Sequence, residues 1–239
     1  MTPSSWPSTT TPTDVWTGAL SHLPDSSRAD LLRDAWVIQM PALSTWLTQV
    51  GARQPAIVMI GTVRVYLSSS VGRQIAILYA TAGSALGFGD APSSHVPSRT
   101  EAVTPSALLR INPVRLERLI RTDPAVASMV ADELARQLDD TMAALSVYAF
   151  GSIRQRAARH LLYCAQPSGE DGRATVAITH QQIADSIGSV REVVGRALRE
   201  LGERGLIEVR RGCIELRDIE AIRAAARLAD PPTRGFSAA

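Results

Sequence analysis

The chain of 239 residues contains no lysine, so all 25 of its basic residues are arginines. Arginine suits flat, forked contacts to phosphate and to guanine. The net charge is only +2, so any affinity for nucleic acid must come from the local placement of charge. Two cysteines, Cys164 and Cys213, are far apart and in no metal-like spacing. This pattern favours a reduced, cytoplasmic protein.

Long hydrophobic runs are also missing, because no apolar stretch approaches the roughly 18 residues that are needed to span a bilayer. The start, MTPSSWPSTTTPTD, lacks the basic and apolar blocks of a secretion signal. It is rich in Ser, Thr and Pro, so we expect residues 1–13 to form a disordered tail and residues 231–239 to be loose. We expect no membrane partner. The remaining length allows two domains, each with its own core.

The N-terminal half changes from helical to strand character. Residues 14–36 hold short amphipathic helix patterns such as SSRADLLRDAW. Between residues 37 and 112, short runs rich in Val, Ile and Leu alternate with Gly, Pro and Ser, as in AIVMIGTVRVYL, RQIAILYA and SALLRI. Consecutive strands of an all-β domain have this appearance. The regular spacing of the glycines fits a barrel or jelly roll.

A helical period begins at Asn112. NPVRLERLIRTD predicts one short helix, and Pro124 stands where a first-turn proline would start the next. The segment from there to about Tyr148 has no Gly or Pro. Its seam residues recur at alternating steps of four and three, so the helix is expected to pair with a copy of itself. The alternative is a helix packed only on its own β domain. The seam residues are Ala127, Ala131, Leu134, Leu138, Thr141, Leu145 and Tyr148.

Residues 151–230 show the order helix, strand, two short helices, hairpin, helix. Thr179 and Gln182 match a capping box, and Gly188 is a natural helix stop. Ser189 is expected to open the next helix, 189–202, with Glu192 completing a second capping box. LIEVRRGCIEL reads as two strands around Arg211 and Gly212, a hairpin of the kind called a wing.

The helix predicted at 189–202 has two distinct faces when it is projected at about 100° per residue. Val190, Val194, Ala197, Leu198 and Leu201 gather on one side, and Arg191, Glu192, Arg196 and Arg199 gather opposite. A helix of this kind can enter the major groove, where arginine reads guanine and glutamate accepts from cytosine. The alternatives are a merely solvated face and, for Glu192, a role only in the cap.

These motifs resemble those of the cyclic-AMP receptor protein / fumarate–nitrate regulator (Crp/Fnr) family over about residues 20–218. ITHQQIADSIGSVREVVGRALRELGERGLIEV is similar to its winged helix-turn-helix, whose R-E-x-x-x-R helix reads the operator. The resemblance implies an α+β chain with an N-terminal β-roll of the cyclic-nucleotide-binding type at 14–123. A dimerisation helix at 124–150 and a DNA-binding domain at 151–230 would follow. The implied partners are DNA with TGTGA-like half-sites, a second copy of the chain and RNA polymerase.

The same resemblance assigns individual roles in the DNA-binding half. Arg191, Glu192 and Arg196 fall on base-contacting positions. Thr179 and Gln181 fall on positions that touch phosphate, and His180 stands where an arginine phosphate contact is usual. Val193 replaces a usual threonine contact, which suggests weaker anchoring of the backbone. Ser189 and Arg199 complete the predicted DNA-binding set.

AIVMIGTVRVYLSSSVGRQIAILYATAGSALG is similar to the sensor half of the family, whose cassette has a glutamate after a glycine and later an Arg-Ser or Arg-Thr pair. Here Phe88 follows Gly87. The gapless register puts Val96-Pro97 at the pair, whereas a shifted register puts Arg99-Thr100 there. Lacking the arginine, the pocket would leave a phosphate unpaired, which argues against cyclic AMP. The resemblance places Thr141 and Met142, on the dimer helix, near the base.

Other chemistries find less support in the sequence. Two cysteines are too few for an iron–sulfur sensor, and only His22 and His95 in the N-terminal half could ligate haem. His160 and Cys164 lie one helical turn apart, and a Cys–His pair could form a nucleophile. The pair has no glycine-rich elbow or orienting group beside it, so we expect no enzyme and no certain cofactor. A protein-interaction module with an idle helix-turn-helix is the remaining alternative.

Overall fold

The computed structural model describes residues 18–47, 54–70, 74–88, 98–167, 173–210 and 212–227. The chain is divided into two compact units. The first comprises Met1–Ser68 and Ala76–Thr141, and the second comprises Ser69–Ile75 and Met142–Ala239. Both expected tails, residues 1–13 and 231–239, lie outside the described residues. No helix in the described part of the chain is long and apolar enough to cross a membrane.

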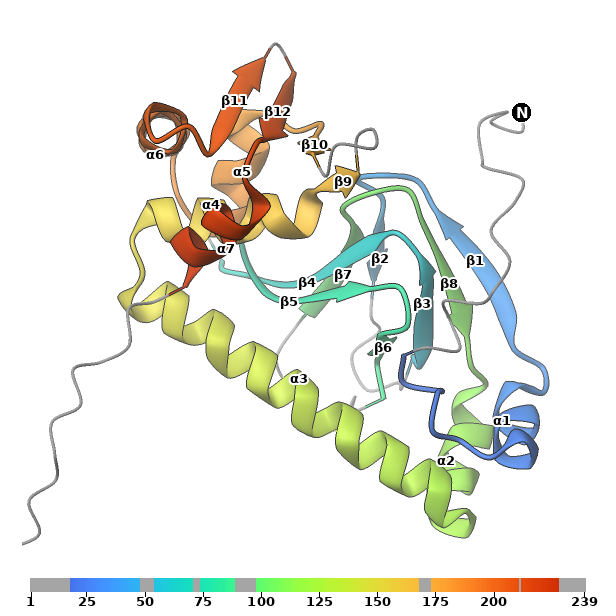
Figure 1. Cartoon of the computed structure of the whole chain (residues 1–239). Coiled ribbons are helices and arrows are strands. Elements are labelled where there is room, and N and C mark those ends of the chain that lie inside the picture. Colours follow the sequence, from blue (N-terminus) through green and yellow to red (C-terminus); the bar gives the residue numbers. More distant parts are fainter. Residues whose placement is uncertain are drawn as a thin grey trace, which may run out of the picture. The chain divides into compact units, whose positions relative to one another are not determined.

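Two antiparallel four-stranded sheets build the first unit, and this confirms the predicted β-roll (Figure 1). One sheet has the order β1-β8-β3-β6 and the other β2-β7-β4-β5. Their inner faces enclose a buried cluster that includes Val58, Val63 and Leu108. The strands are β1 (Trp36–Met40), β2 (Thr45–Leu47), β3 (Ala56–Ile60), β4 (Thr62–Ser68), β5 (Gln74–Thr81), β6 (Ala85–Leu86), β7 (Ser98–Ala102) and β8 (Ser106–Arg110).

A glycine turn joins β3 and β4. Gly61 has φ +85°, and a Cβ there would lie 2.4 Å from the carbonyl oxygen of Pro105. Only glycine meets both conditions without strain. The run AIVMIGTVRVYL therefore folds as two strands that belong to different sheets.

Two short helices, α1 (Asp25–Leu32) and α2 (Pro113–Thr122), are held together by charge. Asp30 accepts from Arg115 Nη1 at 2.8 Å and from Arg118 Nη2 at 2.9 Å. The sequence pattern placed Trp36 at the end of a helical segment. That prediction was wrong, because Trp36 opens β1 and pairs with Arg110 of β8. Its neighbour Asp34 has φ +65°, which ends the helical path.

The long helix α3 (Pro124–Phe150) begins at Pro124, as predicted. Within the first unit, Val126, Met129 and Val130 of this helix join the core. Glu133, only 6% exposed, accepts from the backbone N–H of Ala85 at 3.3 Å. The next turn repeats the attachment, since Gln137 Nε2 donates to the Ala85 carbonyl at 2.8 Å. These contacts fix the rotation of α3 about its axis.

The second unit contains a helical cluster and a small sheet (Figure 1). The sheet has the order β11-β12-β10-β9, and β11 and β12 form the predicted wing. Ser152 and Gln155 make a capping box that starts α4. The elements are α4 (Ile153–Cys164), β9 (Gln166–Pro167), β10 (Ala174–Val176), α5 (His180–Ile187), α6 (Arg191–Glu203), β11 (Ile207–Arg210), β12 (Cys213–Leu216) and α7 (Ile219–Ala226).

Candidate nucleic-acid interface

Helix α5 has a defined start and a defined end. The capping box predicted for Thr179 and Gln182 is present, since the N–H of Thr179 donates to Gln182 Oε1 at 2.8 Å and the N–H of Gln182 donates to Thr179 Oγ1 at 3.2 Å. At the other end Gly188 has φ 66°, and the N–H of Ser189 donates to the Ala184 carbonyl at 2.9 Å. This turn fixes the direction in which the chain leaves α5.

The second capping box was wrongly predicted. Helix α6 begins at Arg191, its N-cap is Val190, and the cap has no side-chain hydrogen bond. Ser189 belongs to the turn that closes α5, since its N–H donates to the Ala184 carbonyl, and α6 begins two residues later. Val190 has extended backbone, φ −118° and ψ 151°, and is 55% exposed. Its predicted place on the buried side was therefore also wrong, because a residue outside the helix does not follow the helical projection.

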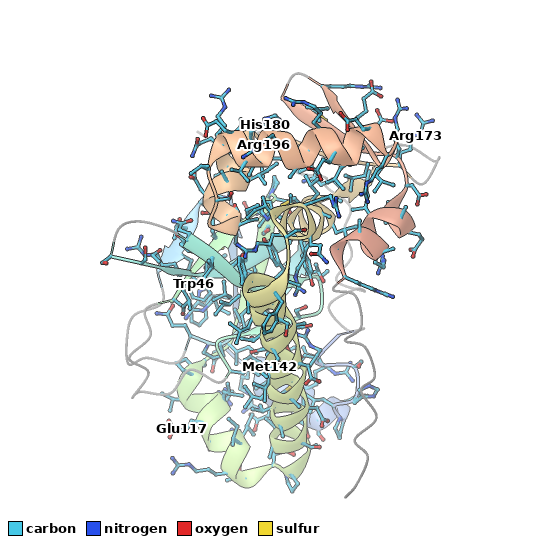
Figure 2. The ribbon with its side chains drawn as sticks, turned by 90° about the vertical axis from the view of Figure 1, so that its left-hand side faces the viewer. Trp46, Glu117, Met142, Arg173, His180 and Arg196 are labelled. Carbon is cyan, nitrogen blue, oxygen red and sulfur yellow. The ribbon has the colours of Figure 1, made fainter. Side chains whose placement is uncertain are left out.

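The remaining two-faced pattern of α6 is confirmed. Val194, Ala197, Leu198 and Leu201 are buried, and α6 packs on α4 and α5. Arg191, Glu192, Arg196 and Arg199 are exposed. Among the described residues these four side chains form no ion pair, whereas Arg154 and Arg210 of the same unit are paired with Glu200 and Glu215. Figure 2 shows Arg196 among the side chains of this part of the chain. The charged face of α6 is thus left available for another molecule.

A trough of about 490 Å³ runs along this face. The start of α5 contributes His180, and a Cβ added to Gly195 of α6 would lie 3.7 Å from its Nδ1. Sequence reasoning missed Val209, which stands on β11 and is 45% exposed. The alternation along β11 puts Val209 on the same side as the buried Ile207, so the sequence does not indicate that the Val209 side chain is exposed. The trough is lined by His180, Arg191, Glu192, Gly195, Leu198, Arg199 and Val209.

The outer face of the wing carries a charge network that the sequence pattern did not indicate. Glu215 is 6% exposed and pairs with Arg210 at 2.8 Å and with Arg173 at 3.3 Å. Hydrogen bonds from Arg210 and Arg217 lower the pKa of the Glu208 carboxyl below its ordinary value. The same partner, Glu208, raises the pKa of Arg210. The network holds the wing strands in one arrangement and keeps their charges largely compensated.

The residues predicted for an effector pocket have mixed environments. Phe88 is 1% exposed and belongs to the core cluster with Ile111 and Leu116. Gly87 adopts φ 67° just before it. In β7, Thr100 is buried and Arg99 is exposed.

On α3, Thr141 donates its hydroxyl to the Gln137 carbonyl at 2.7 Å, and Met142 is 57% exposed. His95 and the Val96-Pro97 register lie outside the described residues.

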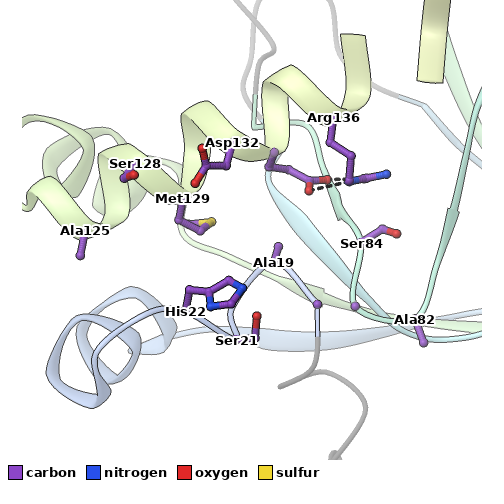
Figure 3. Close-up of a pocket in the computed structure, with 13 residues that line it drawn as sticks. Ala19, Ser21, His22, Ala82, Ser84, Ala125, Ser128, Met129, Asp132 and Arg136 are labelled. Atoms are coloured by element: carbon purple, nitrogen blue, oxygen red, sulfur yellow. Dashed lines mark hydrogen bonds and ion pairs between the residues drawn. The ribbon is translucent and has the colours of Figure 1, made fainter. Parts of the chain in front are cut away.

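A different hollow, of about 570 Å³, lies in the first unit (Figure 3). It is bounded by the segment around His22, the turn at Ser84 and the first half of α3. Figure 3 labels Asp132 and Arg136 on the α3 side of this hollow and His22 opposite them. None of the predicted effector residues lines it. Among the described residues Asp132 has no ion pair, whereas Arg136 is bonded to Glu133 and Asp140.

The Cys–His pair is a packed feature of α4. Cys164 Sγ lies 3.5 Å from His160 Nε2, and the two residues are 4% and 2% exposed. A nucleophile must be reached by its substrate, and burial of both side chains opposes that role.

An exposed cationic helix, set by a glycine turn and flanked by a β wing, defines the winged helix-turn-helix class of DNA-binding domain. Residues 155–225 match the Crp-like helix-turn-helix domain. The C-terminal unit is thus a Crp-like helix-turn-helix DNA-binding domain, and the chain is similar to transcription regulators of the Crp/Fnr family.

Alignments with known transcription regulators extend over most of the chain. The transcriptional regulator LdrP of Thermus thermophilus is 29% identical over 165 residues, 68% of this chain and 82% of that protein. The cAMP-activated global transcriptional regulator Vfr of Pseudomonas aeruginosa is 28% identical over 204 residues, 80% of this chain and 94% of Vfr.

Solved structures share the fold. FixK2 from Bradyrhizobium japonicum superposes with a TM-score of 0.68 at 21% identity and covers 82% of this chain and 100% of FixK2. A Crp/Fnr-family regulator from Thermus thermophilus gives a TM-score of 0.64 at 23% identity and covers 80% of this chain and 98% of that chain.

Proposed function

We propose that the chain is a homodimeric, sequence-specific transcription regulator that reads a palindromic operator with α6. The observation that carries this proposal is the exposure of Arg191, Glu192 and Arg196, which form no ion pair among the described residues, on a helix whose opposite face is buried. Arginine can fork onto guanine O6 and N7, and glutamate can accept from cytosine N4. We infer half-sites that contain G·C pairs, such as TGTGA and its complement.

Contacts to the DNA backbone come from neighbouring groups. Thr179, His180 and Gln181 stand at the start of α5, where backbone N–H groups and the helix dipole favour a phosphate. Ser189 lies in the turn before α6, and Arg199 lies one turn beyond Arg196. Phosphate contacts of this kind orient a protein on the duplex without reading sequence.

The dimer interface is proposed along α3. Five large apolar side chains of this helix are exposed in the single chain: Leu134 at 38%, Leu138 at 62%, Met142 at 57%, Leu145 at 57% and, at its last residue, Phe150 at 82%. A stripe of this length on one helix is stabilised by burial against a second copy. Twofold symmetry then presents two α6 helices to half-sites about one helical turn apart.

For the sensor half, residues 14–123, we propose a β-roll whose cyclic-nucleotide cassette is degenerate. Phe88 is in the core and cannot accept a hydrogen bond from a ribose hydroxyl. Vfr is named as cAMP-activated, and activation by cyclic AMP is the property that this proposal expects the chain to lack. The exposed side chain of Arg99 supports the alternative, in which Arg99 and Thr100 serve an effector in the shifted register. Calorimetry with cyclic AMP separates the two, because saturable binding below millimolar concentration requires the shifted register.

The test of function is a fluorescence-anisotropy titration of the full chain. One labelled duplex carries two inverted TGTGA half-sites with centres about 10 base pairs apart, and a second has the same composition in scrambled order. We expect tighter binding to the palindrome, and a steep loss of affinity as salt increases. Equal affinity for the two duplexes would refute sequence-specific recognition of this operator.

A further inference from the structure

His180 stands apart from the other polar groups at the start of α5, because its ring has no hydrogen bond or ion pair with any described residue. Thr179 and Gln182 satisfy each other in the capping box, and Gln181 donates to Asp185 at 2.8 Å. The imidazole is half-buried and lines the trough. A polar ring held in place by neighbours but without a partner is available to a ligand that enters the trough.

The ring of His180 lies beside Gly195 of α6. A Cβ at that position would be in ordinary contact with His180 Nδ1, at 3.7 Å, so α6 passes directly beside the ring. The charged groups that face His180 across the trough are Arg191, Glu192 and Arg199 of α6, and β11 contributes the uncharged Val209. Two guanidinium groups against one carboxylate make the trough suitable for an anion.

We propose that His180 binds a backbone phosphate of the DNA as an imidazolium, so that the affinity of this regulator for DNA increases as the pH falls through neutrality. The inference rests on the proposed function and adds a form of regulation to the same site. Histidine is the side chain whose charge changes between about pH 5 and pH 8. An arginine at this position would stay charged throughout that range.

The direction of the effect follows from linkage. A phosphate beside an imidazole favours its charged form, so the complex takes up a proton near neutral pH. We expect the affinity to be several-fold higher at pH 6 than at pH 8 for each site. The effects of the two sites in a dimer multiply. Phosphodiesters keep their charge across this range, so the DNA itself adds nothing to the slope of affinity against pH.

The experiment repeats the anisotropy titration between pH 6 and pH 8 at constant ionic strength. Three variants are compared with the wild type: His180→Gln, His180→Arg and, as a matched control, His22→Gln. We expect His180→Gln to bind at every pH with about the affinity of the wild type at pH 8. His180→Arg should bind tightly at every pH. His22→Gln should keep the full slope, because His22 is exposed in the first unit.

Two outcomes separate this inference from the proposed function. A wild-type slope that persists in His180→Gln, in a protein that still prefers the palindrome, overturns the role of His180 and leaves the function intact. Failure to prefer the palindrome at any pH counts against the function instead. The role of His180 is still tested in that case, since a phosphate contact is independent of sequence and its slope should also appear on the scrambled duplex.

Discussion

The backbone N–H of Ser189 donates to the carbonyl oxygen of Ala184 at 2.9 Å, across a Gly188 that has φ 66°. This bond sets the angle at which the chain leaves α5 and enters α6. The helix that we propose to read DNA is therefore oriented by a backbone conformation that glycine adopts and other L-residues avoid.

Gly188→Ala should destabilise the second unit by about 1–2 kcal/mol, because an alanine at this φ brings its Cβ against the following carbonyl. Urea unfolding followed by circular dichroism measures the change. Gly202→Ala is the matched control, since Gly202 lies inside α6 and a Cβ there would be 3.8 Å from its nearest neighbour. That variant should be about as stable as the wild type or up to ~1 kcal/mol more stable. Equal changes in the free energy of unfolding for the two variants would show that the left-handed conformation of Gly188 does not require glycine.

Arg196→Ala should weaken binding to the palindrome by about 1–3 kcal/mol and relax selectivity at one base pair of each half-site. The reason is loss of a forked contact to guanine that lysine or alanine cannot replace. Anisotropy on duplexes with single-base changes measures both effects. Arg204→Ala serves as the control, because Arg204 is exposed at the opposite end of α6. A uniform loss of affinity across all duplexes would instead assign Arg196 to a phosphate.

The parts of this interface that sequence reasoning predicted are those fixed by nearby residues. The capping box of Thr179 and Gln182 depends on a spacing of three, and the buried side of α6 depends on a helical period. Pro124 likewise begins α3 because its fixed φ and missing N–H suit a first turn. Each of these features depends on residues that are close together in the sequence.

The parts that were missed depend on contacts across the fold. Serine is a favoured residue type at the N-cap position. The N–H of Ser189 nevertheless donates to Ala184 in the turn that closes α5, and α6 starts two residues later. Trp36 fits the amphipathic pattern before it, but pairing with Arg110, far along the chain, makes it a strand residue. Val209 looks like an ordinary wing residue until the structure places it beside α6.

Leu138→Glu should dissociate the proposed dimer, because a carboxylate would have to be buried in an apolar seam without a partner. Light scattering after size exclusion reports the mass in solution. Ala143→Glu is the control, since Ala143 is exposed and lies two residues, or about 200°, from Leu145. The control should remain dimeric. If both variants and the wild type have the mass of one chain, α3 does not form the interface.

Two carboxylates near α1 and α2 predict an acid-sensitive first unit. Hydrogen bonding from Arg118 is the largest influence on Asp30 and lowers its pKa, and a hydrogen bond from Ser27 does the same for Asp123. A carboxyl whose pKa is lower in the folded chain stabilises the fold above its unfolded value, about 3.9. That stability is lost as pH falls through the lower, folded-state pKa.

Asp30→Asn should therefore lower the Tm of the first unit at pH 6, and the difference from the wild type should shrink as the pH approaches 3. The difference shrinks because, below the unfolded value, the unfolded chain takes up a proton that the folded carboxyl resists, and the stability that the charged Asp30 contributes decreases. Differential scanning calorimetry at several pH values measures the difference. Asp139→Asn is the control, because Asp139 is exposed and has no ion pair among the described residues. A Tm difference between Asp30→Asn and the wild type that stays constant from pH 6 to pH 3 would show that the arginine contacts do not act through the charge of Asp30.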